Sequence, residues 1–230
     1  AFIIAKFLSS QGIPSEFCDA RNLIITDDHF TAARVDFKTT NEKITAHFKT
    51  TEKIQVVTGF IASTEEGEVT TLGRGGSDYT AAILAAALDS EEIQIWKDVD
   101  GVMTADPRKV PGALLMKELS YEEAMELSHF GAKVIHPPTM RPAMQKSIPI
   151  RIKNTFAPKK EGSLIKAKAL KSDFPIRGIT AINEVSLILL EGSGLQAIPG
   201  ISARLFSALA KKEVNIILIS QASSEHSICF

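Results

Sequence analysis

The sequence predicts an α/β protein, an αβα sandwich with a mainly parallel central sheet, followed by a second and smaller unit. Two observations carry this prediction. Short apolar, β-branched runs alternate with longer helical segments over most of the 230 residues. Beyond residue 155 a polar stretch with Pro and Gly interrupts the pattern, and a new set of apolar runs follows. Ligand sites of such proteins lie beyond the carboxyl ends of the sheet strands.

Strands of the first unit are expected where apolar runs are too short to form a stable helix. Such runs occur at residues 53–61, 93–96 and 148–153, which are rich in β-branched side chains and bounded by turn residues. The loops that follow residues 61 and 96 are therefore the expected places for a functional site.

Helices are expected where composition or capping residues favour them. Residues 2–8 are apolar on every side, which predicts a helix buried in the core. Residues 77–88 are rich in Ala and Leu and are expected to be strongly helical. A further helix is expected at residues 121–130, because Ser120 and Glu123 form a capping box ahead of it.

A domain boundary is expected within residues 155–174, which are polar and rich in turn-forming residues. We place it after residue 170, so that residues 1–170 form the first domain and residues 171–230 the second. No internal repeat is visible in the sequence.

The second unit is expected to follow the order strand, helix, strand and partial strand. Residues 178–191 are strand-like, and residues 202–213 form an amphipathic helix with Lys side chains near its carboxyl end. Residues 214–220 read as a fully apolar strand, and another strand is expected from residue 227.

Composition excludes several classes of function. With 26 basic and 27 acidic residues, the charge gives no reason to expect binding to nucleic acid or anionic lipid. No apolar run approaches the roughly 18 to 20 residues that span a bilayer, so no membrane span is expected. Cys18 and Cys229 have neither metal-site nor C-x-x-C spacing, which indicates free thiols and a cytoplasmic protein. A small ligand is the expected partner.

The most informative motif is LGRGGSDYTA, at residues 72–81, directly ahead of the Ala-rich helix. Its glycines allow a ligand to approach the backbone closely, and the free N–H groups at the helix start favour an anion. Arg74 offers a bidentate fork for a carboxylate, and Asp78 can take an ammonium group, so the pair would suit an amino acid. The alternative is an ordinary glycine-rich loop in which Ser77 is the N-cap and Asp78 complements the helix dipole.

A second motif, DVDGVMTADPR at residues 98–108, follows an apolar strand and concentrates charged residues around a Gly and a Pro. Its basic side chains can neutralise phosphates, while its carboxylates can contact ribose or magnesium-bound water. The alternative is a solvated connection in which Asp106 and Pro107 open a β-turn.

A third motif, FGAKVIHP at residues 130–137, is weaker when taken alone. A single Lys133 after a helix usually complements the helix dipole, and His136 before two prolines suits a structural role.

Together, the three motifs resemble the aspartokinase family, which has the amino acid kinase fold, in their order and separations. The resemblance extends over essentially the whole chain. Residues 194–206 and 215–227 resemble the first regulatory ACT domain of that family, and they are most similar to its bifunctional aspartokinase/homoserine dehydrogenase branch.

The resemblance implies transfer of the γ-phosphoryl group of ATP to the side-chain carboxylate of L-aspartate, giving 4-phospho-L-aspartate. Mg²⁺ would be held mainly by the nucleotide phosphates, with no metal site formed by the protein itself. Arg74 would bind the α-carboxylate of aspartate, and Asp78 would bind its α-amino group or orient a catalytic lysine. The implied substrate residues are Arg74, Gly75, Gly76, Ser77 and Asp78. The implied nucleotide residues are Lys97, Asp98, Met103, Arg108 and Lys133.

Three departures from the family affect these expectations. Lys97 and Met103 stand where many members have Thr and Tyr. The family's Lys-Phe-Gly-Gly-Thr-Ser segment and a Glu-containing substrate segment are expected ahead of Ala1, so we expect a longer polypeptide and an inactive chain when it is alone. The ACT domain, a βαββαβ unit in the family, is incomplete.

The ACT resemblance also implies regulation. Such domains pair their sheets between subunits and bind an amino acid at the interface, so a homo-oligomer is expected. The implied effector residues are Gly200, Ile201, Asn215 and Gln221, with threonine as the favoured effector and lysine second. The alternative roles of Asn215 and Gln221 are to cap a helix and to sit in a turn.

Two other functions remain open on the sequence. One is a non-catalytic module that senses an amino acid and uses the kinase-like part as a scaffold. The other is a kinase that phosphorylates a different carboxylate, such as glutamate or carbamate, because the spacing of Arg74 and Asp78 does not exclude one more methylene group.

Overall fold

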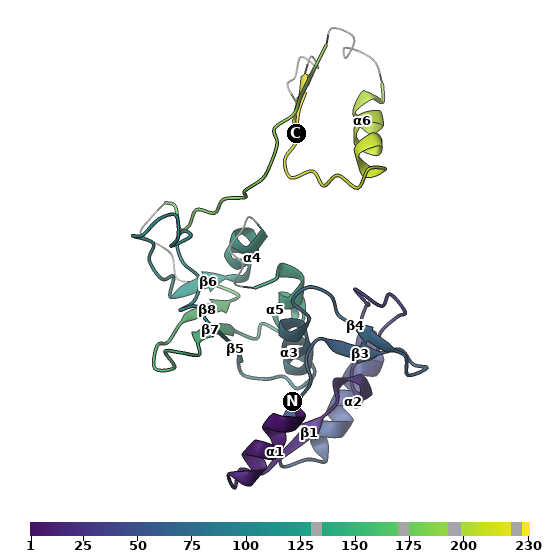
Figure 1. Cartoon of the computed structure of the whole chain (residues 1–230), viewed down its shortest axis with the longest axis vertical. Coiled ribbons are helices and arrows are strands. Elements are labelled where there is room, and N and C mark those ends of the chain that lie inside the picture. The colour runs from purple at the N-terminus through teal and green to yellow at the C-terminus, as the bar shows by residue number, and fades with distance from the viewer. Residues whose placement is uncertain (130–134, 170–174, 193–198, 222–226) are drawn as a thin grey trace. The chain divides into compact units, whose positions relative to one another are not determined.

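The computed structural model describes residues 1–129, 135–169, 175–192, 199–221 and 227–230 (Figure 1). The chain divides into two compact units, Ala1–Ala181 and Ile182–Phe230, which we describe separately. The expected boundary after residue 170 lies outside the described residues.

The strands of the first unit form three hydrogen-bonded groups within its described residues. One pair is parallel, one pair is a hairpin, and four strands make a sheet in the order β5-β7-β8-β6. The strands are β1 (Ser15–Cys18), β2 (Ile54–Val57), β3 (Ile61–Ser63), β4 (Val69–Thr71), β5 (Ile93–Lys97), β6 (Glu118–Ser120), β7 (Ile150–Asn154) and β8 (Ser163–Lys166). Pairing is parallel between β1 and β2, β5 and β7, and β6 and β8, and antiparallel between β3 and β4 and between β7 and β8.

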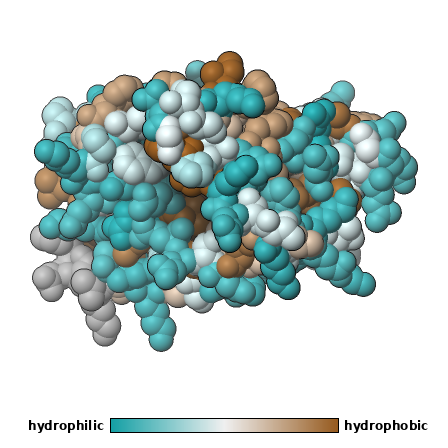
Figure 2. Space-filling view, turned by 90° about the horizontal axis from the view of Figure 1, so that it is seen from below, coloured by the Kyte–Doolittle hydropathy of each residue, from teal (hydrophilic) through white to brown (hydrophobic). Residues whose placement is uncertain are grey.

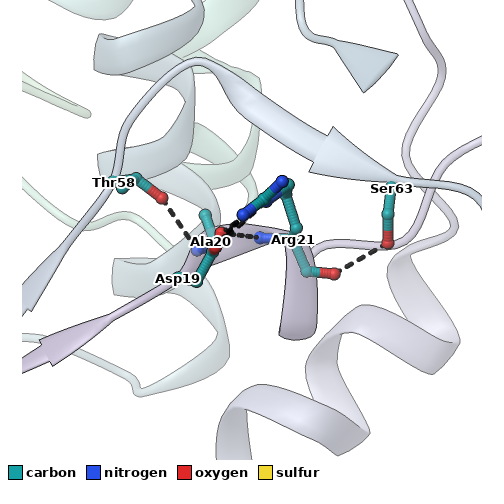
Figure 3. Close-up of polar contacts among 5 residues, drawn as sticks. All are labelled: Asp19, Ala20, Arg21, Thr58 and Ser63. Atoms are coloured by element: carbon teal, nitrogen blue, oxygen red, sulfur yellow. Dashed lines mark hydrogen bonds and ion pairs between the residues drawn. The ribbon is translucent and has the colours of Figure 1, made fainter. Parts of the chain in front are cut away.

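The single strand expected at residues 53–61 is wrong, because the chain turns between β2 and β3. Phe60 has a positive φ of 76°, which a continuous strand does not allow. Figure 3 shows Thr58, which follows β2, accepting a hydrogen bond from the backbone N–H of Ala20 at 2.8 Å. On the far side of the turn, Ser63 donates to the carbonyl of Arg21 at 2.7 Å. These bonds hold the turn against the chain that leaves β1.

Helices of the first unit cover the strands (Figure 1). The longer ones are α1 (Phe2–Ser10), α2 (Phe37–Lys49), α3 (Gly76–Ala87) and α4 (Tyr121–His129), and the shorter ones are α5 (Arg141–Gln145), η1 (Ala20–Asn22) and η2 (Pro137–Met140). Helix α3 packs against α2, α5, η2 and β5, and α4 packs against β6, β8 and η2. The predicted capping box is present: Ser120 Oγ accepts from the N–H of Glu123 at 3.1 Å, and the Glu123 carboxylate accepts from the N–H of Ser120 at 2.7 Å.

Isoleucines dominate the core of the first unit. Ile93 and Ile95 on β5, Ile150 and Ile152 on β7, and Ile165 on β8 are buried, so alternate side chains of each strand face one cluster. A second cluster forms around Ile24, Ile44 and Ile83. Cys18 and Cys229 carry free thiols, as predicted.

Helix α1 forms as expected, but its predicted burial is wrong. Ala5 is its buried residue, whereas Phe2, Ile4 and Phe7 are more than half exposed and Ile3 is 81% exposed. The apolar sequence thus identified the helix, but burial depends on what lies against it. The main contacts of α1 are with β1 and β2, which leaves much of its apolar surface exposed. Figure 2 shows a face of the molecule on which hydrophobic residues lie scattered among hydrophilic ones.

The second unit contains a three-stranded antiparallel sheet in the order β10-β11-β9, together with one helix among its described residues. Its elements are β9 (Leu189–Glu191), α6 (Ile201–Ala210), β10 (Ser220–Gln221) and β11 (Ser227–Cys229). The strands expected at residues 178–191 and 214–220 are therefore too long. Pairing is limited to residues 188–191 of the first and to Ser220 of the second, since no described strand lies beside the residues that precede them. In the described part of the chain, no helix is both long and apolar enough to cross a membrane.

Candidate active site

A cavity of about 480 Å³ lies at the start of α3. The loop between β4 and α3 and the first turn of α3 supply most of its lining, and Thr31 and Phe60 supply the rest. The lining residues are Thr31, Phe60, Gly73, Arg74, Gly75, Gly76, Ser77 and Asp78. The structure therefore brings all of the predicted substrate residues to one cavity.

Gly75 is the N-cap of α3, in place of Ser77, and only glycine suits its position. Its φ of 72° is in the left-handed region. A Cβ on Gly75 would lie 2.8 Å from His136 Cβ and 3.1 Å from Thr139 Cγ2. The loop therefore rests directly on the chain at η2, and its close approach explains the glycine. The N–H of Gly76 donates to the Gly73 carbonyl at 3.0 Å, so this amide closes the turn.

Thr80 connects the two sides of the cavity. Its hydroxyl accepts a hydrogen bond from the N–H of Phe60 at 3.1 Å and donates to the carbonyl of Gly76 at 3.0 Å. Thr80 is buried, and both of its partners belong to segments that line the cavity. The turn after β2 and the first turn of α3 are thereby held together.

The carboxylate of Asp78 forms an ion pair with Lys97. The Nζ of Lys97 lies 3.1 Å from Oδ2 of Asp78, and the two side chains are 26% and 21% exposed. Asp78 is in the first turn of α3, where a carboxylate complements the helix dipole, and Lys97 is the last residue of β5. The pair therefore joins the cavity to the segment predicted to bind the nucleotide.

Arg74 is exposed and lines the cavity close to His136. The Nδ1 atom of His136 is buried and has no hydrogen-bond partner among the described residues. Burial, and to a smaller extent the charge of Arg74, lowers the pKa of His136 below its ordinary value of 6.5. The lowered pKa favours the neutral form of His136, which lies beneath a loop that carries a cation.

The segment at residues 98–116 is folded back on itself by backbone bonds. The N–H of Thr104 donates to the Leu114 carbonyl at 2.8 Å, and the N–H of Met116 donates to the Val102 carbonyl at 2.9 Å. The buried hydroxyl of Ser163 accepts from the N–H of Val102 at 2.9 Å and donates to the Met116 carbonyl at 2.6 Å. The segment is therefore anchored to β8.

The predicted nucleotide residues differ in how they are placed on this segment. Lys97 points to Asp78, while Asp98 is exposed. Met103 is half-buried and forms an isolated backbone bridge with Leu115. The guanidinium of Arg108 pairs with Asp106 at 2.9 Å, yet its side chain is 83% exposed and accessible to an anion. Lys133 lies outside the described residues.

Two residues of the cavity, Thr31 and Phe60, were not predicted. Thr31 belongs to a loop that is hydrogen-bonded to β4. The N–H of Ala33 in this loop donates to the carbonyl of Thr71 at 2.9 Å. Thr71 also donates from its N–H and its hydroxyl to the carbonyl of Phe30, so long-range contacts place Thr31 at the cavity and no local motif marks it. Phe60 could have been noticed as a large apolar residue after a glycine, where a strand gives way to a turn.

Metal-binding side chains are not clustered in the parts of the chain that the structure describes: no group of three or more His, Cys, Asp or Glu is placed to hold an ion. The carboxylate of Asp100 accepts hydrogen bonds from Asn154 Nδ2 and Lys160 Nζ, each at 2.7 Å. Asp98 of the same segment is exposed.

The second unit has a cavity of about 730 Å³. It is lined by β9 and α6 through Leu190, Ile201, Ala203, Arg204, Leu205, Ser207, Ala208 and Lys211. Of the predicted effector residues, Ile201 lines this cavity and Gly200 is the adjoining N-cap, with a φ of 89°. Asn215 and Gln221 are exposed and do not contribute to this lining.

Comparison with known proteins finds matches to two families in separate parts of the chain. Residues 1–154 match the Amino acid kinase family, and residues 188–230 match an ACT domain. The chain is 41% identical, over 237 aligned residues, to the bifunctional aspartokinase/homoserine dehydrogenase 1 of Arabidopsis thaliana, a chloroplastic protein. That alignment covers 100% of this chain and 26% of the relative, so the chain spans about a quarter of its length.

Solved structures of aspartokinases have the same fold. E. coli aspartokinase III in complex with lysine and aspartate superimposes with a TM-score of 0.79 at 32% identity, covering 99% of this chain and 51% of that one. The same enzyme in complex with aspartate and ADP gives a TM-score of 0.78, also at 32% identity, with coverage of 99% and 51%. The predicted α/β fold class and the resemblance to aspartokinases are confirmed. The chain belongs to the amino acid kinase family, and its last residues, 188–230, carry an ACT domain.

Proposed function

We propose that this chain is the acceptor-binding part of an aspartate kinase, which transfers the γ-phosphoryl group of ATP to the side-chain carboxylate of L-aspartate. One observation carries the proposal: Arg74 and Asp78, of opposite charge, line the same cavity at the start of a helix. A zwitterionic amino acid needs both charges, and the helix start favours its anionic groups. The relatives named for aspartate and ADP support this substrate class.

Arg74 binds the α-carboxylate of aspartate in this proposal, because its exposed guanidinium can form two parallel hydrogen bonds with a carboxylate. Ser77 lines the same cavity and adds a hydroxyl donor, while Gly75 and Gly76 keep the backbone low enough for the ligand to approach. Asp78 faces the ammonium group. The side-chain carboxylate of aspartate is then left to point toward the nucleotide.

Phosphoryl transfer requires little covalent participation by the protein. An oxygen of the ionised substrate carboxylate forms a new bond to the γ-phosphorus, and the bond from that phosphorus to the bridging oxygen of ADP breaks. The products are an acyl phosphate and ADP, and no proton has to be removed from the attacking carboxylate. Catalysis then consists of positioning and of stabilising negative charge on the transferred oxygens.

The nucleotide is proposed to bind along the segment that follows β5, with Lys97, Asp98, Met103, Arg108 and Lys133 as its contacts. The exposed guanidinium of Arg108 can bind phosphate oxygens once it releases Asp106. Mg²⁺, when bound, neutralises the β- and γ-phosphate oxygens, and Asp98 is the residue proposed to contact its hydration shell.

The ACT domain is proposed to bind an amino-acid effector and to pair with a second copy of the chain. Threonine remains the favoured effector, and lysine, named with one related structure, is the alternative. Gly200, Ile201, Asn215 and Gln221 are the proposed contacts. The predicted cytoplasmic location also stays a proposal, since one relative is chloroplastic.

The test is isothermal titration calorimetry of the chain with aspartate, with magnesium-ADP and with threonine. Arg74→Met, which removes the charge and keeps the aliphatic stem, should weaken aspartate binding by about 10-fold or more, as expected for a charged hydrogen bond. Lys146→Met is the control, because it removes an exposed ion pair with Asp89 beyond the other end of α3.

The outcomes separate the proposed function from its alternatives. Threonine binding without aspartate binding would favour a sensing module. Equal affinity for glutamate and aspartate would favour a kinase for another carboxylate. An unchanged aspartate affinity in Arg74→Met would contradict the proposed binding of the α-carboxylate by Arg74.

A further inference from the structure

The ion pair of Lys97 and Asp78 conflicts with the simplest account of the acceptor site. The Asp78 carboxylate already has one cation, Lys97 Nζ, at 3.1 Å from its Oδ2 before the ammonium group of an amino acid approaches it. The ammonium groups of Lys97 and of the amino acid repel each other when both lie against the Asp78 carboxylate. One of them therefore needs another anion when the amino acid and the nucleotide are both bound.

We propose that Lys97 exchanges partners when the nucleotide binds: its ammonium group moves from Asp78 to a phosphate, and Asp78 is thereby released for the ammonium group of the amino acid. This inference rests on the proposed function and names a specific coupling within it. It makes Lys97 the residue through which the nucleotide raises the affinity for the acceptor.

The backbone places Lys97 where such an exchange is feasible. Lys97 ends β5 in register with Asn154 of β7, and its carbonyl accepts from the N–H of Thr155 at 2.8 Å, so its main chain is fixed. The side chain is long, flexible and 26% exposed, so its ammonium group can change partners without a backbone movement. The next residue, Asp98, begins the segment proposed to bind the nucleotide.

Charge balance favours the exchange over two independent sites. In the free protein, Lys97 neutralises Asp78. With both ligands bound, the phosphate neutralises Lys97 and the substrate ammonium neutralises Asp78, so each partly buried charge keeps a partner. With the amino acid alone, Asp78 must accommodate both cations. Affinity for the amino acid should therefore depend on the nucleotide, and the reverse dependence follows by linkage.

The experiment measures aspartate affinity by calorimetry with and without saturating magnesium-ADP. In the unsubstituted chain, the nucleotide should tighten aspartate binding by about 5-fold or more. In Lys97→Met, the nucleotide should no longer change the affinity for aspartate. Without nucleotide, this variant should bind aspartate more tightly than the unsubstituted chain does. It should bind magnesium-ADP more weakly than the unsubstituted chain does. Trp96, the only tryptophan of the sequence, precedes Lys97 and gives a fluorescence signal for nucleotide binding.

Two further variants complete the test. Lys146→Met breaks a Lys–Asp pair at the opposite end of α3 and should leave the coupling intact. Lys97→Gln replaces Lys97→Met if circular dichroism shows that the methionine variant is unfolded. A nucleotide effect of the same size in the Lys97 variants would overturn the exchange. Aspartate binding to the unsubstituted chain with no nucleotide effect would also overturn it, whereas no aspartate binding at all would instead count against the proposed function.

Discussion

At the scale of single residues, Gly75 shows how the cavity depends on one missing side chain. Its backbone has a positive φ of 72°, and the space where a Cβ would lie is filled by His136 and Thr139. The positive φ and the close approach of these side chains both occur in the loop that carries Arg74. Conformation and close approach therefore act together at this position.

Gly75→Ala should destabilise the protein and distort the cavity. The left-handed conformation alone costs an L-residue about 1 to 2 kcal/mol, and the contact with His136 adds to this cost. The free energy of unfolding from urea titration and the aspartate affinity should both fall. Gly112→Ala is a suitable control, since nothing lies within 4 Å of a Cβ there. Equal stability of the two variants would contradict this account.

His136 gives a prediction about pH. Its pKa is lowered in the folded state, mainly by burial, so the unfolded chain binds a proton more readily. The contribution of neutral His136 is complete above the unfolded pKa of about 6.5 and is lost as the pH falls through the lower, folded value. The free energy of unfolding should therefore decrease from pH 7.5 to 5.5 by more than it does in His136→Gln. Parallel pH profiles of the two proteins would exclude this role.

At the scale of elements, the sequence predicted best where local chemistry decides the structure. The start of α4 follows from Ser120 and Glu123, whose side chains bond to each other's backbone, and α3 follows from its Ala-rich composition. The buried strands β5 and β7 follow from their β-branched residues. These elements lie at or near their expected positions.

Prediction failed where structure depends on distant contacts. The turn at Phe60 arises from a positive φ and from bonds to Thr80 and Leu72, none of which leaves a local pattern. The same holds for the exposure of Ile3 in α1 and for Thr31 at the cavity. The glycine-rich loop was recognisable because its chemistry is local, whereas the ion pair of Asp78 depends on where β5 ends.

Ser120→Ala tests the capping box of α4. The substitution leaves the N–H of Glu123 without its Oγ acceptor and should lower the free energy of unfolding by about 1 kcal/mol. Ser128→Ala in the same helix serves as the control, because its hydroxyl has no hydrogen bond among the described residues and alanine favours a helix. Chemical denaturation measures both, and equal losses would show that the cap contributes nothing.

At the scale of the whole molecule, the two units differ in how much apolar surface they bury. The first unit contains both core clusters, whereas Val185, Leu187 and Leu218 of the second unit are exposed. The second unit has its own sheet and helix, so we treat it as a separate folding element.

A protease test follows from the division of the chain. Glu184 is exposed, has a positive φ of 58° and lies in an irregular segment near the start of the second unit. A glutamate-specific protease should cut there early under native conditions, and the larger product should keep its circular dichroism. Glu184→Gln should remove this cut and leave cuts at other glutamates unchanged. Persistence of the same product in that variant would place the accessible site elsewhere.

The hydroxyl of Thr80 has a consequence for substrate choice. Because it bonds to Phe60 on one wall of the cavity and to Gly76 on the other, the walls cannot separate here without breaking the bond between Phe60 and Thr80. A guest that is longer by one carbon would therefore have to fit between walls held at this separation. Discrimination between aspartate and glutamate would then depend on the fixed distance between these walls. The buried hydroxyl oxygen of Thr80 sets that distance without contacting either amino acid.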